Sequence, residues 1–160
     1  MATGEAEPGT NSNWCRHIDC KVAIPVDDTA FPVVRIVLPR RTALGDLTLH
    51  FGHVATLARE RGPMFVVNDA RALDFTSFTA AHRREAAAGF ANFVAELPGY
   101  VLGEAYISSS AVARGLLTAV RWMEPVPWPT QVFSSSESAM QWAYARVVAT
   151  TATRIQTITR

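Results

Sequence analysis

The residues best placed to do chemistry follow a short apolar run in the middle of the chain. Met64 to Val67 are four consecutive apolar residues, the pattern of a strand buried on both faces. Asn68 and Asp69 come directly after it, and their side chains favour turns and helix caps. In an open α/β sheet, ligands and regulators bind at the loops that leave the carboxyl ends of strands. This stretch is therefore the first candidate site.

A second polar group, Asp74, Thr76, Ser77 and Thr79, lies in the loop that follows, just before a helical pattern. Side-chain oxygens at this position can cap a helix, because they accept hydrogen bonds from its free N–H groups. The hydroxyl groups could instead be phosphorylated, with Thr76 as the first choice and Ser77 as the second. A phosphate close to a helix N-terminus is stabilised by about 0.3–1 kcal/mol.

One helical face could hold a metal ion. His50 and His53 are three residues apart, and Asp46 lies four residues before His50. Zinc sites usually need three or four ligands, and nothing nearby in the sequence completes this set. A solvated helix face is the preferred interpretation, and no metal or cofactor is predicted. His17 and His82 have no evident partner.

A hydrolase could be assembled from Ser109, His82 and Asp69, but the chain has no Gly-x-Ser-x-Gly nucleophile motif. The serines from Ser108 to Ser110 are better explained as a helix cap. An enzyme is therefore the weakest of the functional hypotheses.

Two further features could form a surface for a partner or a ligand. Glu104 is the one acid in an apolar strand, and Tyr106 shares its face, which makes that face semi-polar. Trp122 and Trp128 stand among prolines and could form a binding ridge. The simpler alternative is a loop that its tryptophans hold against the core.

Composition limits the possible functions. The 160 residues are 49% apolar and 18% charged, which suits one soluble domain. The net charge of +1 gives no reason to expect binding to nucleic acid or to an anionic membrane. No apolar run approaches the roughly 20 residues of a membrane span.

Cys15 and Cys20 would point to opposite faces of a strand, so no disulfide between them is expected. The start of the chain lacks the pattern of a secretory signal, and a cytoplasmic location is predicted.

Periodicity and stop signals predict the elements. Residues 1–13 are expected to be a disordered tail, residues 14–149 one domain, and residues 150–160 a fraying C-terminal tail. A turn is predicted at Pro25–Asp28, and Thr42 is predicted to cap the first helix. The expected strands are Trp14–Ile24, Val33–Leu38, Met64–Val67, Tyr100–Ile107 and Thr130–Phe133. The expected helices are 43–61, 79–97, 111–123 and one that runs from a Ser134/Glu137 capping box to residue 149.

This order predicts an α/β fold with a mixed, mostly parallel sheet of about five strands and four main helices. The helices are expected to pack on one face of the sheet. Their inward stripes should bury Leu44, Phe51, Phe90 and Leu116. Open sheet edges also favour a twofold homodimer.

The element order and several segments resemble the STAS-domain superfamily, and more closely its SpoIIAA-like branch, with the anti-sigma-factor-antagonist fold. The resemblance covers about Cys15 to Val148. The segments that carry it are the opening hairpin, the helix that ends at Gly62, the strand Met64–Val67 with Asp69, the loop Leu73–Ser77, the segment Ala111–Val120, and the closing segments Pro129–Phe133 and Glu137–Trp142.

In antagonists of this family, an Asp-Ser-Ser/Thr-Gly loop carries a hydroxyl group that a partner kinase phosphorylates. Asp74 matches the aspartate and Thr76 falls on the phosphoacceptor, whereas Phe75 replaces the first serine and Ser77 replaces the glycine. The resemblance implies a non-enzymatic bacterial regulatory or protein-interaction domain whose partner is a kinase or an anti-sigma-type regulator. The residues expected at the partner or ligand surface are Asp69, Asp74, Phe75, Glu104, Tyr106, Trp122 and Trp128.

The same fold occurs in lipid-transfer domains. The alternative function is therefore the binding of a small apolar molecule or lipid by the semi-polar sheet face and the Trp122–Trp128 region.

Overall fold

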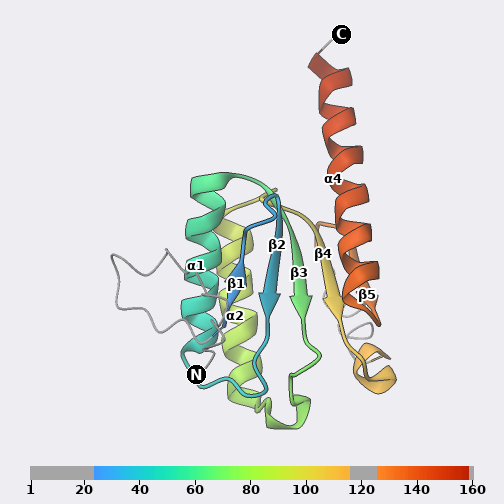
Figure 1. Ribbon diagram of the computed structural model, residues 1–160. Helices are drawn as coiled ribbons and strands as arrows, with labels where there is room; N and C mark the ends of the chain where they lie inside the picture. Colours follow the sequence, from blue (N-terminus) through green and yellow to red (C-terminus); the bar gives the residue numbers. More distant parts are fainter. Residues whose placement is uncertain (1–23, 116–125, 159–160) are drawn as a thin grey trace, which may run out of the picture.

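The chain folds around a five-stranded sheet (Figure 1). The computed structural model describes residues 24–115 and 126–158, with side chains up to residue 150. The strands lie in the order β1-β2-β3-β4-β5, with β1 antiparallel to β2 and all other neighbours parallel. This confirms the predicted mixed, mostly parallel sheet. Its strands are β1 (Val26–Asp27), β2 (Val33–Val37), β3 (Met64–Asp69), β4 (Val101–Ile107) and β5 (Thr130–Phe133).

Helices cover both faces of this sheet. They are α1 (Asp46–Arg61), α2 (Ala80–Glu96) and α4 (Ser136–Ile158); residues 111–115 are also helical, and η1 (Phe75–Ser77) is a short 3-10 turn. Figure 1 shows α1 and α2 together on one side of the strands and α4 on the other. The expectation that the main helices share one face is therefore wrong.

The composition of β3 explains the second helical layer. All six residues of β3 are buried, and successive side chains in a strand point to opposite faces. Met64 and Val66 pack in the cluster that α1 and α2 cover, whereas Phe65 and Val67 pack against Ala143 and its neighbours on α4. A strand that is apolar on both sides needs cover on both sides.

The ends of the described chain differ from the prediction. The expected strand Trp14–Ile24 lies outside the described residues except for Ile24, which is fully buried. The short antiparallel strand β1 (Val26–Asp27) instead lies within Pro25–Asp28, where a turn was predicted. At the other end, α4 continues to Ile158, beyond the predicted end at residue 149, and it passes the amino ends of the strands (Figure 1).

The first helix also begins later than predicted. Gly45 precedes it as the N-cap, in place of Thr42, so Leu44 lies outside the helix and is 63% exposed. Phe51 and Phe90 are half-buried rather than inaccessible, and Leu116 lies outside the described residues. The Phe51 ring lies against Gly89 of α2 and also packs against the core cluster under the sheet.

The edges of the described sheet are β1 and β5. The homodimer expected from open edges stays a prediction. Among the described residues, no helix is both long and apolar enough to cross a membrane.

The packing of α4 on the second face can be tested at Gly103 of β4. A methyl group there would lie 2.9 Å from Phe65 Cδ1 and 3.3 Å from Trp142 Cη2, and both distances are too short. We expect Gly103→Ala to lower the free energy of unfolding by about 1–3 kcal/mol, because the rings must move in a packed core. Urea unfolding measures this change.

Gly52 of α1 provides the matched control, because nothing lies within 4 Å of the methyl group that Gly52→Ala would add. That variant should be more stable by about 0.5–1 kcal/mol, since alanine restricts the unfolded chain and favours a helix. An unchanged unfolding midpoint for Gly103→Ala would contradict the packing of α4 over β4.

Candidate functional site at the carboxyl edge of the sheet

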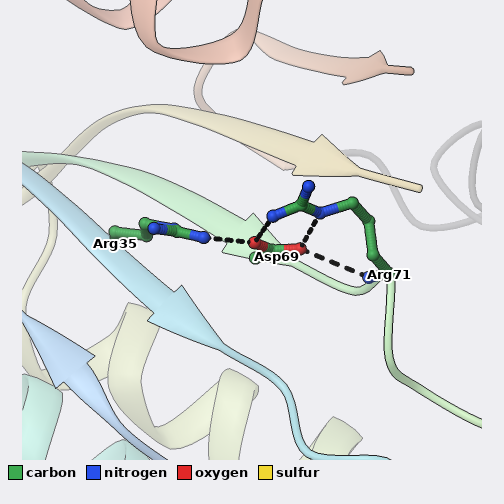
Figure 2. Close-up of polar contacts among 3 residues, drawn as sticks. All are labelled: Arg35, Asp69 and Arg71. Carbon is green, nitrogen blue, oxygen red and sulfur yellow. Dashed lines mark hydrogen bonds and ion pairs between the residues drawn. The ribbon is translucent and has the colours of Figure 1, made fainter. Parts of the chain in front are cut away.

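Asp69 lies at the carboxyl edge of the sheet, where the parallel strands end. Its side chain is only 5% exposed and accepts hydrogen bonds from two guanidinium groups (Figure 2). Arg71 binds it with two groups, Nε at 2.8 Å and Nη2 at 2.7 Å, and Arg35 of β2 reaches it with Nη2 at 2.5 Å. The hydrogen bonds from Arg71, together with the one from Arg35, hold the pKa of Asp69 well below its usual range, although burial alone would raise it. Asp69 is therefore ionised and ties the end of β3 to β2.

The loop after β3 carries the Thr76 hydroxyl at the surface. Thr76 is exposed, and its Oγ1 donates a hydrogen bond to Asp74 Oδ1 at 2.6 Å, while its backbone N–H donates to the same oxygen at 3.0 Å. These two bonds from Thr76, with smaller electrostatic contributions from Arg40 and Arg41, lower the pKa of Asp74. Ser77 is half-buried and donates to the backbone oxygen of Asp74 at 2.7 Å.

Thr79 caps α2, and His82 completes a reciprocal capping box with it. Thr79 Oγ1 accepts from the backbone N–H of His82 at 3.4 Å, and the backbone N–H of Thr79 donates to His82 Nδ1 at 3.3 Å. His82 Nε2 contacts the backbone oxygen of Thr42 at 3.0 Å, which requires the proton on Nε2 in the neutral ring. His82 thus has partners that its place in the sequence did not indicate.

Glu85 of α2 caps the other helix of this layer. Its Oε1 accepts from the backbone N–H groups of Gly45 at 2.9 Å and Thr48 at 3.0 Å, and from the Thr48 hydroxyl at 2.9 Å. Burial alone would raise the pKa of Glu85, but these bonds lower it. The Glu85 carboxylate of α2 therefore caps the start of α1, whereas Thr42 was predicted to cap it from within the same segment.

A second polar group is buried on the face that α1 and α2 cover. Glu104 is 7% exposed, and its Oε1 accepts from Asn68 Nδ2 at 2.8 Å and from the Tyr106 hydroxyl at 2.7 Å. Trp128 is buried, contacts the Phe90 ring at 5.7 Å between centroids, and donates from Nε1 to Glu104 Oε2 at 3.4 Å. The semi-polar face is therefore internal, and the loop tryptophan packs into the core.

His50 is also buried, at 7% exposure, where a solvated helix face was predicted. Burial, with a smaller electrostatic contribution from His53, lowers the pKa of His50 to about 4. Its ring is therefore neutral near pH 7. Within residues 24–115 and 126–158, no group of three or more His, Cys, Asp or Glu residues could hold a metal ion.

The fold brings some of the candidate residues together and separates others. Asp69 ends β3 at the carboxyl edge, and Asp74, Phe75, Thr76 and Ser77 lie in the loop that follows it. Glu104, Tyr106 and Trp128 instead form the internal cluster. Trp122 lies outside the described residues. The hydrolase triad is not assembled, because His82 pairs with Thr79 and Thr42 while Asp69 pairs with the two arginines.

Sequence reasoning missed Arg35, Arg71 and Glu85, and it found no hydrogen-bond partner for Asn68 or His82. Apart from Arg71, which binds Asp69 two residues away, each of these residues hydrogen-bonds a partner on a different segment. The spacing of Asp69 and Arg71 was a usable signal. Arg35 was a second usable signal, because it is the one charged residue inside an apolar strand. Glu104 was singled out in the sequence for the same reason.

The structural role of Asp69 can be tested by Asp69→Asn. At pH 7 this variant should lose about 1.5–3 kcal/mol of stability, because hydrogen bonds from two guanidinium groups to a carboxylate become bonds to a neutral amide. The folded pKa of Asp69 lies below its ordinary value of 3.8, so the stabilisation is fully present above pH 3.8. It is lost as the pH falls from there through the folded pKa. Urea unfolding should therefore show the gap between wild type and variant narrowing below about pH 4.

Glu96→Gln is the control, since Glu96 pairs with Arg59 and both side chains are more than half exposed. Its effect should be under about 1 kcal/mol. A gap between wild type and Asp69→Asn that stayed constant from pH 7 to pH 3 would contradict the assignment.

Comparison with known proteins identifies the fold. No family model matches the chain, and no curated protein matches it. Among solved structures, the chain is similar to the crystal structure of an uncharacterized protein from the DUF3478 family with a SpoIIAA-like fold, from Shewanella loihica PV-4. The TM-score is 0.54 at 11% identity, over 75% of this chain and 91% of that one. The chain therefore has the SpoIIAA-like α/β fold that its sequence predicted.

Proposed function

We propose that this protein is a non-enzymatic regulatory or protein-interaction domain of the STAS type, with its partner surface in the loop after β3. The observation that carries the proposal is the position of Thr76. Its hydroxyl group is exposed at the carboxyl edge and hydrogen-bonded to Asp74. In an open α/β sheet this edge is the usual place for a binding site.

Helix capping does not account for Thr76. Thr79 is the residue whose side chain caps α2, and the Thr76 hydroxyl makes its bond within the loop. The hydroxyl is therefore available for another role. This favours Thr76 over Ser77 as the regulatory hydroxyl, since Ser77 is half-buried and bonded to the backbone of Asp74.

A phosphate on Thr76 would change the charge of the loop directly. It would break the bond from the Thr76 hydroxyl and place about two negative charges beside the Asp74 carboxylate. Arg40 and Arg41 lie within electrostatic range of Asp74 and could pair with the phosphate instead. Such an exchange of partners gives phosphorylation a way to alter what the loop binds.

The alternative, a binder of small apolar molecules or lipids, ranks second. It relies on Glu104, Tyr106 and Trp128 being available to a ligand. In the structure these side chains hydrogen-bond to one another, and both Glu104 and Trp128 are buried. A ligand would have to displace contacts that are already made.

The regulatory proposal is tested by capturing partners from the native cell with wild type, Thr76→Ala, Thr76→Glu and the neighbouring control Ser77→Ala. We expect Thr76→Glu to change the captured partners relative to Thr76→Ala, because a carboxylate mimics part of the phosphate charge. Ser77→Ala should behave as wild type. Mass spectrometry of the protein from the same cells should find phosphate on Thr76.

Because Thr76 is exposed, the two Thr76 variants should keep the wild-type free energy of unfolding to within about 0.5 kcal/mol, which separates binding from folding. Identical partners for all four proteins, with no phosphate on Thr76 or Ser77, would refute the regulatory switch.

A further inference from the structure

The hydroxyl groups in the loop after β3 differ in what they bind. The Thr76 hydroxyl donates to a carboxylate oxygen, Asp74 Oδ1, at 2.6 Å. The Ser77 hydroxyl donates to an uncharged backbone oxygen at 2.7 Å. The Thr79 hydroxyl serves the cap of α2, where it lies 2.7 Å from His82 Nδ1 and accepts from the backbone N–H of His82. Of these three hydroxyl protons, that of Thr76 is the one that points to a negative charge, since an ionised carboxylate can only accept.

Asp74 is fixed in place before any partner arrives. Its backbone N–H donates to the backbone oxygen of Arg40 at 3.0 Å, and its backbone oxygen accepts from the Ser77 N–H at 3.0 Å and from the Ser77 hydroxyl. The Thr76 N–H donates to Asp74 Oδ1 at 3.0 Å. The two bonds from Thr76 lower the pKa of Asp74, so the carboxylate is ionised at neutral pH. The acceptor for the Thr76 hydroxyl is therefore both charged and held by the backbone.

This arrangement matches what phosphoryl transfer to a hydroxyl group requires. In protein kinases, an aspartate accepts the proton of the substrate hydroxyl and orients its oxygen towards the γ-phosphate. The transition state is loose, so orientation matters more than early removal of the proton, and a weakly basic carboxylate can serve. With its proton directed at Asp74, the Thr76 oxygen keeps its lone pairs for the phosphorus atom. Thr76 is exposed, so a nucleoside triphosphate held by another protein can approach it.

We propose that Asp74 positions the Thr76 hydroxyl for phosphorylation, so that this chain supplies the proton acceptor and a partner kinase supplies the nucleoside triphosphate. Thr76 Oγ1 forms a bond to the γ-phosphorus, the bond from that phosphorus to the oxygen of the β-phosphate breaks, and the nucleoside diphosphate leaves. The hydroxyl proton passes to Asp74 Oδ1 and then to water. The inference rests on the proposed function and adds to it the residue that selects Thr76 over Ser77.

The chain holds a second turn with the same hydrogen bonds, and this turn provides a matched control. Thr29 donates to Asp27 Oδ1 from its hydroxyl at 2.6 Å and from its backbone N–H at 3.1 Å. Because β1 is antiparallel to β2, this turn lies at the opposite edge of the sheet from Thr76. Asp27→Asn therefore makes the same chemical change in the same kind of turn without touching the candidate loop.

The role of Asp74 is tested with the full chain, an extract of the native cells and ATP labelled in its γ-phosphate. Mass spectrometry locates the phosphate, and the initial rate on Thr76 is measured over a series of protein concentrations. For Asp74→Asn, we expect the maximal rate to fall at least about 10-fold, because the neutral amide does not take up the proton and holds the nucleophile less well. The half-saturating concentration should stay within about twofold of wild type, since asparagine keeps the shape of the surface.

Asp27→Asn should leave both quantities unchanged, and urea unfolding of the two variants checks that a loss of folding does not explain a loss of rate. An undiminished maximal rate for Asp74→Asn would overturn the inference and leave the proposed function standing. A rise in the half-saturating concentration alone would also overturn it, because Asp74 would then be a contact for the kinase. An equal loss of rate in Asp27→Asn would overturn it as well. If the extract places no phosphate on wild-type Thr76, the inference and the regulatory switch fail together.

Discussion

The burial of β3 on both faces is the constraint on which the rest of the structure depends. β3 is the middle strand of the five, pairs in parallel with β2 and β4, and has no exposed residue. One face of it must be covered by α1 and α2 and the other by α4. Parallel pairing also means that β2, β3, β4 and β5 end at the same edge, so the loops that follow them meet there.

Hydrogen bonds between these loops turn the carboxyl edge into one connected unit. The backbone N–H of Leu38 donates to the backbone oxygen of Asp69 at 3.0 Å, and Asp69 itself binds Arg35 and Arg71. The helix cap that α2 provides through Glu85 fixes the start of α1 in the same region.

The two buried acids of the sheet, Asp69 and Glu104, show that a polar side chain can stabilise the fold without being open to a partner. Glu104 and Asp69 are both nearly inaccessible and both accept hydrogen bonds from several donors. Burying a charge is costly unless it is well paired, so these networks stabilise the fold and do not by themselves form a site. The groups that a partner can reach at this edge include the Thr76 hydroxyl and the guanidinium groups of Arg40 and Arg41. The candidate function is accordingly one of surface recognition.

Local patterns in the sequence were enough to determine β3, β4, β5, the helices α1 and α2, and the position of Thr76 between a buried strand and a helix. Each of these depends on neighbours within one turn or one strand, and such neighbours are visible in the chain. Only the tertiary structure decided that α4 covers the second face, that His50 is buried, and that Arg35 reaches Asp69 across 34 residues of sequence. It likewise decided that Glu85 of α2 caps α1, in place of Thr42. These contacts join segments that are distant in the chain. They form only when strand pairing and the packing of helices on both faces of the sheet bring those segments together. The spacing of residues within one segment does not encode such contacts.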